Sequence, residues 1–344
     1  MVIIMHVCEN SSVQSFFFVI SSVFILLTVF VNGSTDACNS IATAVGSGSL
    51  KTKNAVGLSA LLNMIGVLSG AILNNQVQHT LNELLSFIEK QNSCKVVFCI
   101  LFSVVLWTVV AWYFAVPTSE SHSLISAIAG ASLLLSQKTS TVNSAWKTVL
   151  IGAVLSVVSG YISAYCMQKI FNKIKKFDFV SLRTHNAARL QIFFAALMSL
   201  LHGYQDGQKF IGLALCINQS AKNNAVSTSS FRLVIALVMG IGTACGGGRI
   251  VRKIAFELTQ LNSCSGLMAD FVSSLVIFLS SVLGLPISTT QVKTAAVAGI
   301  GNANDGCVDK KTIKEILLIW GLTFPCCSLI SFLMLRLLMC FRLL

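Results

Sequence analysis

Two polar motifs recur in the same order, about half a chain apart, within sequence that is otherwise apolar. The first motif is Gly33-Ser34-Thr35-Asp36 and its copy Gly203-Tyr204-Gln205-Asp206, and the second is Pro117-Thr118-Ser119-Glu120-Ser121-His122 and its copy Pro286-Ile287-Ser288-Thr289-Thr290-Gln291. The proline follows the aspartate by 81 positions in the first copy and by 80 in the second. A duplicated apolar unit whose polar breaks keep their spacing is typical of membrane proteins built from two inverted repeats, in which the breaks meet at a central site.

The composition places this duplicated unit in a lipid bilayer. Hydrophobic residues make up 55% of the 344 positions and charged residues only 10%, against about 25% charged residues in soluble domains. Charge-free runs near or above the roughly 20 residues of a spanning helix cover 10–35, 54–82, 96–119, 148–168, 271–292 and 316–335. Shorter apolar runs, which predict half-helices or re-entrant segments lining a buried cavity, cover 39–50, 121–137, 210–221 and 294–304. The sequence therefore predicts an all-α integral membrane protein with about 10–12 membrane segments in two inverted repeats.

The run 13–31, with no Lys or Arg before it, predicts a retained first span rather than a signal peptide.

The basic residues lie between the apolar runs, and their densest cluster marks the boundary between the two repeats. The net charge of +12 lies in the gaps between apolar runs and not on one soluble face, which argues against a nucleic-acid partner. The densest cluster comprises Lys169, Lys173, Lys175, Lys176, Arg183 and Arg189. By the positive-inside rule this cluster predicts a cytoplasmic connector over 168–189, between a first repeat at 1–167 and a second at 190–344. We expect a multi-pass protein of the plasma (inner) membrane.

Acids at membrane depth are costly and need a reason. Asp36 and Asp206 hold equivalent places, each after a glycine that we expect to let the helix unwind. Unwound carbonyl groups together with a carboxylate suit a sodium ion or a proton. A third acid, Asp270, lies on a predicted membrane helix with small residues beside it, and either serves the same site or forms hydrogen bonds across the helix bundle.

The Pro-x-Ser turns predict sites of the opposite polarity. Proline fits the first turn of a helix, and neighbouring Ser or Thr side chains cap the free N–H groups. A helix N-terminus with free N–H groups attracts anions. The hydroxyl residues in position to take part are Ser119, Ser121, Ser288, Thr289 and Thr290. Carboxylates for a cation and helix starts for an anion together predict cation-coupled uptake of a small oxyanion.

A lysine distinguishes the second repeat from the first. Lys209 follows Asp206 by three positions, where the first repeat has Asn39 three positions after Asp36. This spacing lets Lys209 reach Asp206 on one helical face. Its ammonium group would take the place of a sodium ion, so the second repeat would use protons or a fixed positive charge and leave at most Asp36 and Asn39 for sodium. The alternative is a permanent salt bridge that braces a broken helix.

At these residues the chain resembles the inorganic phosphate transporter (PiT) family, and in the second repeat its bacterial branch of low-affinity phosphate permeases. The resemblance rests on Gly33-Ser34-Thr35-Asp36-Ala37-Cys38-Asn39-Ser40, His202-Gly203-Tyr204-Gln205-Asp206-Gly207-Gln208-Lys209, Gly247-Gly248-Arg249-Ile250-Val251 and Leu285-Pro286-Ile287-Ser288-Thr289-Thr290-Gln291, and it extends from about Val31 to Gly301. It implies an all-helical symporter that moves inorganic phosphate with sodium ions or protons, usually as a homodimer. The departures from the family pattern are Thr35 and Gln205 in place of asparagine, Glu120 within the first hydroxyl loop, and Gln291 in place of histidine.

The resemblance also implies roles for individual residues. The coupling cation falls to Asp36, Asn39 and Asp206, and phosphate falls to Ser119, Ser121, Ser288, Thr289 and Thr290. Supporting positions are Glu120, His122, Gln208, Asp270 and Gln291, where His122 either orients the hydroxyl loop or binds substrate.

Two other classes of protein stay open from the sequence. An oxyanion channel would share basic loops and hydroxyl-lined segments but would not require acids in both repeats. An integral membrane enzyme acting on phosphate groups would need a nucleophile beside a base or metal ligands, whereas the five His residues are dispersed. We expect no cofactor beyond the coupling ion, and a substrate that is either free phosphate or a metal–phosphate complex.

Overall fold

The computed structural model describes residues 2–73, 75–114, 116–135, 140–176, 184–218, 227–246, 251–304, 308–341 and 343. In the first half of the chain the helices are α1 (Val2–Thr35), α2 (Asn39–Gly46), α3 (Thr52–Leu73), α4 (Gln76–Leu84), α5 (Ser93–Tyr113), α6 (Glu120–Leu135) and α7 (Ser140–Lys176). In the second half they are α8 (Thr184–Asn218), α9 (Thr228–Cys245), α11 (Ser263–Val282), α12 (Thr289–Ala303) and α13 (Lys310–Cys340). A 3-10 turn (Lys90–Asn92) and a π-helical turn (Lys253–Glu257) complete the described elements. The expected all-α class is confirmed.

Several of these helices are built to cross a membrane. Within the described ranges, the segments long and apolar enough are Ser12–Gly46, Lys90–Tyr113, Trp146–Ile174, Ser263–Val282 and Lys310–Cys340. Large apolar side chains such as Val154 on α7 and Leu333 on α13 are more than half exposed. Exposed apolar helix faces of this kind suit lipid tails and not water.

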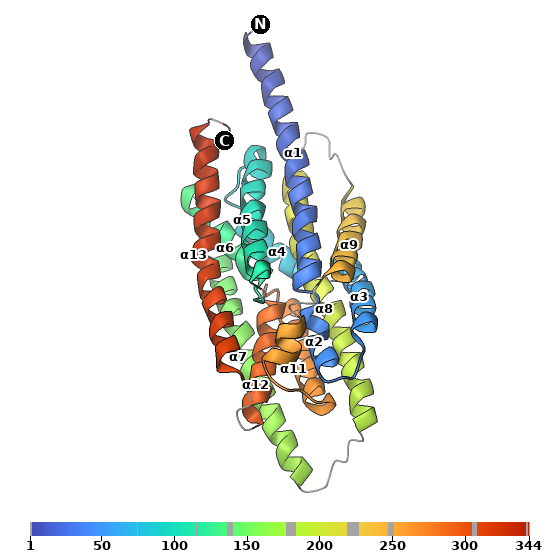
Figure 1. Cartoon of the computed structure of the whole chain (residues 1–344). Coiled ribbons are helices and arrows are strands. Elements are labelled where there is room, and N and C mark those ends of the chain that lie inside the picture. The colour runs from blue at the N-terminus through green and yellow to red at the C-terminus, as the bar shows by residue number, and fades with distance from the viewer. Residues whose placement is uncertain are drawn as a thin grey trace.

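The two repeats pack against each other, and equivalent helices make equivalent contacts. Helix α1 packs against α9 and α5, and its counterpart α8 packs against α3 and α11. Likewise α7 packs against α12, and α13 packs against α6. In Figure 1 α1 descends from the N-terminus, whereas α8 begins at the lower end of the molecule and runs upward. Equivalent helices therefore run in opposite directions, which is the arrangement of inverted repeats.

The duplicated glycines serve helix packing. A Cβ atom added at Gly33 would overlap the backbone of α9, and one at Gly203 would overlap the backbone of α3. A second duplicated pair, Gly130 and Gly299, lies equally close to α13 and α7. Small residues let helices approach within a membrane. The expected unwinding is wrong at Gly203, where α8 continues without a break, and α1 continues through Gly33 to Thr35.

The short apolar runs have different outcomes. The runs 39–50, 121–137 and 294–304 correspond to the short helices α2, α6 and α12, as expected. The run 210–221 does not form a separate half-helix, because its described part is the end of α8.

Two of the long runs are also divided. The run 54–82 contains both α3 and α4, and the run 271–292 contains the end of α11, a turn and the start of α12. At that turn Gly284 has a φ of 69°, which favours glycine. The absence of charge locates apolar sequence, but helix ends are set by turns and caps.

The predicted connector 168–189 is helical where it is described. Residues 168–176 form the end of α7 and residues 184–189 form the start of α8, and 177–183 lie outside the described residues. Both helix ends lie at the lower end of the molecule in Figure 1. The cytoplasmic location and the domain boundaries stay predictions.

Candidate functional site

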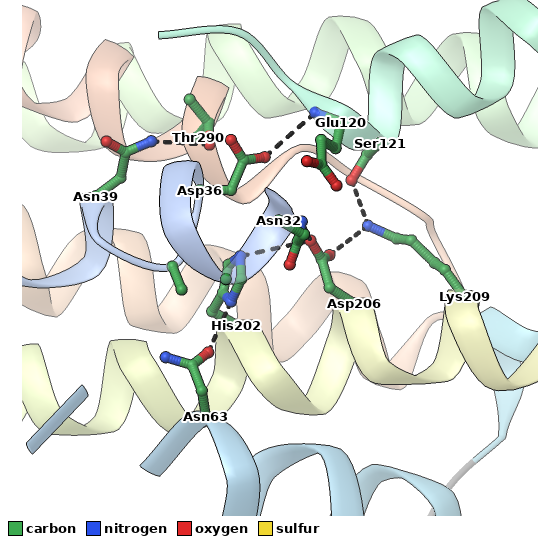
Figure 2. Close-up of polar contacts among 12 residues, drawn as sticks. Asn32, Asp36, Asn39, Asn63, Glu120, Ser121, His202, Asp206, Lys209 and Thr290 are labelled. Carbon is green, nitrogen blue, oxygen red and sulfur yellow. Dashed lines mark hydrogen bonds and ion pairs between the residues drawn. The ribbon is translucent and has the colours of Figure 1, made fainter. Parts of the chain in front are cut away.

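The recurring polar motifs of both repeats meet in one buried cluster. Figure 2 shows side chains from the turn after α1, from the start of α6 and α12, and from the middle of α8 pointing toward one another. The turn arises because α1 ends at Thr35 and residues 36–38 separate it from α2. Asp36 and Asp206, 170 positions apart, are both almost fully buried here. The fold thus brings together the two acids that the sequence pairs by their motifs.

Equivalent serines cap the two short helices that start at the cluster. Ser119 Oγ accepts from the backbone N–H of His122, and Ser288 Oγ accepts from that of Gln291, both at 3.0 Å. A hydroxyl that accepts as a cap keeps its own hydrogen to donate to a ligand. The predicted capping by serine is therefore confirmed.

The prolines of these turns do not lie in the first turn of a helix, which is where the sequence predicted them. Pro117 and Pro286 lie two residues before the capping serines, and therefore outside the first helical turn. The physical reason is that the residue at the start of each helix must supply a side-chain acceptor, which serine has and proline lacks.

The remaining hydroxyls differ in what they contact. Ser121 Oγ accepts a hydrogen bond from Lys209 Nζ, and Thr290 Oγ1 accepts from Asn39 Nδ2 at 3.0 Å. Both contacts join a residue of the first repeat to one of the second. Thr289 Oγ1 is buried and has no hydrogen-bond partner among the described residues. It is free to bind a ligand.

Lys209 reaches Asp206, as its spacing predicts. The Lys209 Nζ–Asp206 Oδ1 distance is 2.6 Å, and both side chains are buried. The other carboxylate oxygen accepts from Asn32 Nδ2 at 3.0 Å. Since α8 is unbroken here, Asp206 is compensated by side chains of α8 and α1 and not by unwound backbone. The sequence interpretation missed Asn32, although its position one helical turn before Asp36 is a signal for it.

A histidine extends this arrangement along the same face of α8. Asn63 Nδ2 donates to the carbonyl oxygen of Ser59 at 2.8 Å, so the Asn63 Oδ1 atom faces His202 Nδ1, 2.7 Å away. Because an amide oxygen only accepts, Nδ1 carries a hydrogen. The second ring nitrogen, Nε2, lies 3.4 Å from Asp206 Oδ2. His202 forms an ion pair with Asp206 only when Nε2 also carries a proton.

The other two acids of the cluster lie beside each other. Asp36 Oδ2 accepts from the backbone N–H of Glu120 at 3.2 Å. Glu120 is 3% exposed, and neither of its carboxylate oxygens has a hydrogen-bond partner in the described part of the chain. Asn39 Oδ1 is likewise buried without one. Asp36 and Asn39 therefore offer the oxygen atoms that a sodium ion prefers.

The supporting residues lie around this cluster. His122 Nδ1 is 3.3 Å from Gln291 Nε2, and both line a cavity of about 50 Å³ next to Ser288 and Phe324. Gln291 Oε1 also accepts from Ser156 Oγ at 2.9 Å. His122 thus lies at the edge of the hydroxyl turns.

Gln208 points away from the cluster. Its Oε1 atom accepts from the backbone N–H of Gln78 in α4 at 3.4 Å, and its Nε2 atom donates to the Tyr204 carbonyl at 3.2 Å. The structure therefore places Gln208 at a helix–helix contact.

Asp270 belongs to a second buried ion pair. Its Oδ1 atom accepts from Lys293 Nζ of α12 and, at 2.6 Å, from Thr43 Oγ1 of α2. Lys293 and Asp270 are both fully buried. Of the two roles left open for Asp270, hydrogen bonding across the bundle is present. Lys293 was missed, although it is the charged residue that separates the apolar runs 271–292 and 294–304.

The Gly-Gly-Arg segment of the sequence resemblance, residues 247–250, lies outside the described residues.

Known proteins share both the sequence pattern and the fold of this chain. The sequence matches the phosphate transporter family twice, over residues 32–189 and again over 178–331. A probable low-affinity inorganic phosphate transporter of Rhizobium meliloti (strain 1021) is 31% identical, with 88% of this chain and 90% of that protein covered. A protein of the same description from Bacillus subtilis (strain 168) is 27% identical, with 86% and 89% covered.

A solved structure shares the fold. It is titled the sodium-dependent phosphate transporter, and it superposes with a TM-score of 0.82 at 19% identity, covering 94% of this chain and 98% of that one. At this level of identity the likeness concerns the fold alone.

Proposed function

Because this chain belongs to the phosphate transporter family and is not an enzyme, we propose that it is a symporter that takes up inorganic phosphate with protons or sodium ions. One observation carries the proposal. The acids and hydroxyls of the duplicated motifs, from both repeats, form a single buried cluster (Figure 2). A central site shared by inverted repeats is the geometry that alternating access requires, since each repeat can move against the other around it.

Phosphate binds where α6 and α12 begin. Two helix starts present N–H groups and the positive ends of their dipoles to an anion. The capping hydroxyls of Ser119 and Ser288 can still donate, and the Thr289 hydroxyl has no competing partner within the described ranges. Ser121 and Thr290, already bonded to side chains of the opposite repeat, would exchange those contacts for phosphate oxygens.

The coupling cation binds beside the phosphate. Asp36 and Asn39 provide a carboxylate and an amide oxygen for sodium, whereas the carboxylate of Asp206 is already held by the Lys209 ammonium. The second repeat therefore works with a fixed charge or with protons, and at most one sodium ion is needed.

The setting of the protein follows from the same proposal. We propose a multi-pass protein of the plasma membrane, with its basic segments on the cytoplasmic side by the positive-inside rule, and a homodimer there. The transported species is phosphate, free or as a complex with a divalent metal.

The test is uptake of labelled phosphate by purified protein in proteoliposomes. Accumulation above the equilibrium level under an imposed sodium or pH gradient is the expected result, and the gradient that drives it identifies the coupling ion. Passive equilibration under every gradient would instead identify an oxyanion channel. Adding or chelating divalent metal in the same assay separates free phosphate from the metal complex.

A further inference from the structure

Glu120 breaks the equivalence of the two hydroxyl turns. It is the first residue of α6, directly after the capping Ser119, and the corresponding residue of α12 is Thr289. Glu120 is buried, and both of its carboxylate oxygens lack hydrogen-bond partners among the described residues. The Asn32 amide, which donates one of its two hydrogens to Asp206, lies beside Glu120 and is left with a second hydrogen to offer it. A buried carboxylate that has only a shared amide as a donor is costly and calls for an explanation.

The side chain borders a small cavity inside the cluster. Together with Asn32, Ser121, Asp206 and Lys209, Glu120 lines a space of about 10 Å³, enough for about one water molecule. Helix α5 contributes the apolar Val104 to this lining. The charged and titratable groups around it are Asp36 after α1, Asp206, Lys209 and His202 of α8, and His122 of α6, which lies toward Phe324 and Gln291.

The charges of this group do not balance. Asp36, Glu120 and Asp206 surround the single ammonium group of Lys209, so three ionised acids would leave a buried excess of two negative charges. An excess of this size inside a membrane is prohibitive, and it would also repel phosphate. Asp206 has Lys209 and Asn32, and Asp36 has the N–H of Glu120. Glu120 is therefore the acid that is left to hold a proton.

We propose, on the basis of the symport function above, that Glu120 binds the proton that is transported together with phosphate. In the protonated form its O–H donates a hydrogen bond to a phosphate oxygen at the start of α6. In the ionised form it repels phosphate, so that phosphate binds only together with the proton. On the releasing side phosphate departs, the O–H bond of Glu120 breaks, and water accepts the proton. The ionised carboxylate then lies near the Lys209 ammonium while the empty site turns back to the side on which phosphate binds.

The experiment compares two activities of reconstituted variants. One is exchange of labelled phosphate across liposomes at equal pH and equal phosphate, and the other is accumulation driven by a pH gradient, alkaline inside. Glu120→Gln keeps the size of the side chain and a hydrogen-bond donor but cannot ionise. We expect it to retain exchange at all pH values while gradient-driven accumulation falls to the level of protein-free liposomes. Glu257→Gln, at an exposed acid, is the matched control and should behave as the unmodified protein.

A second variant and the parent protein complete the test. Glu120→Thr introduces the residue of the second repeat and should show the same separation of the two activities, with folding of both variants checked by their thermal unfolding in detergent. Accumulation by Glu120→Gln equal to that of the parent would overturn the proposal. So would loss of exchange in both variants when they fold normally, because Glu120 would then act in binding and not as a proton carrier. If the unmodified protein accumulates phosphate under a sodium gradient but not under a pH gradient, this inference alone is overturned. If it fails to accumulate phosphate under either gradient, the symport function itself is overturned.

Discussion

The three acids of the cluster are compensated in three different ways. Asp206 has an ammonium group and an amide, Asp36 has a backbone N–H, and the side chain of Glu120 has no hydrogen bond from the described residues. The donors around each acid therefore suit the three to different roles, which we propose are a fixed charge for Asp206, a cation ligand for Asp36 and a proton site for Glu120. The hydroxyls differ in the same way, because Ser288 is needed as a helix cap and Thr289 is not.

Thr289 gives the cleanest test of the phosphate site. Its hydroxyl has no partner in the described structure, so Thr289→Val removes a ligand contact without removing an internal hydrogen bond. A hydrogen bond to a charged ligand is worth about 1.5–3 kcal/mol, which corresponds to roughly ten- to a hundredfold weaker phosphate binding. Isothermal titration with phosphate measures this. Thr289→Ser is the control and should bind normally, and normal binding by Thr289→Val would remove Thr289 from the site.

Replacing Ser288 should affect both phosphate binding and the stability of α12, because this serine also caps the helix. Ser288→Ala should weaken binding and also lower thermal stability, because α12 loses its cap, at about 1 kcal/mol. The equivalent change Ser119→Ala should do the same at α6. Loss of binding in only one of the two variants would contradict a site shared by both repeats.

We propose that the charge of Lys209 takes the place of a coupling cation beside Asp206. Lys209→Asn gives the second repeat the residue found in the first and leaves the buried Asp206 carboxylate without its ammonium. We expect a loss of about 3–5 kcal/mol in stability without sodium, partly restored by sodium chloride but not by choline chloride. Thermal unfolding in the two salts measures the difference. Lys209→Arg retains the charge and should show no sodium effect, and equal unfolding of Lys209→Asn in both salts would refute a cation site at Asp206.

At the scale of elements, short helices create the site and long helices hold it in place. α2, α6 and α12 all begin next to the cluster, and α8 passes through it unbroken. The glycine contacts of α1 with α9 and of α8 with α3 bring the long helices close. The Asp270–Lys293 pair then joins α11 to α12, about one helical turn from Thr290. This pair fixes the position of the α12 start relative to α11 and α2.

The Asp270–Lys293 pair should be sensitive to loss of either partner alone. Lys293→Met or Asp270→Leu leaves an uncompensated charge in a fully buried position, which costs about 3–5 kcal/mol. The double variant removes both charges and should recover most of this loss. A double-mutant cycle by thermal unfolding in detergent gives the coupling energy. Additive losses would show that the two residues do not stabilise each other.

At the scale of the whole molecule, inverted repeats put two anion-attracting helix starts and several acids at one place. Helix starts and hydroxyls alone do not distinguish phosphate from sulfate, since both are tetrahedral oxyanions. We expect the carboxylates to add that distinction, because hydrogen phosphate can donate a hydrogen to an ionised acid such as Asp36, whereas sulfate can only accept.

Selectivity among oxyanions tests this consequence of the assembled site. Arsenate, which also carries a hydrogen at neutral pH, should inhibit labelled phosphate uptake strongly, and sulfate at the same concentration should inhibit weakly. Competition assays in proteoliposomes measure both. Equal inhibition by sulfate and arsenate would mean that no ionised carboxylate contacts the substrate.

The sequence by itself determined the features that depend on local pattern. Apolar runs and low charge predicted a helical membrane protein, the repeated landmarks predicted inverted repeats, and the three-residue spacing predicted the Lys209–Asp206 contact. Serine caps follow from local hydrogen bonding and were predicted as well. The caps and the Lys209–Asp206 contact depend on residues within one helical turn of one another, and the repeat can be read by comparing the two halves of the sequence.

Only the tertiary structure decided how the buried charges are satisfied. Asn32 contacts Asp206 across 174 positions, and Lys293 contacts the Ser40 carbonyl across 253, so no local pattern could pair them. That the Glu120 carboxylate finds so few donors among the described helices is likewise visible only when its neighbours are in place. Helix packing also assigned the duplicated glycines to close contacts and kept α8 unbroken at Asp206. The physical reason is that a buried polar group takes its partners from whichever helices the fold brings near, and those helices are distant in sequence.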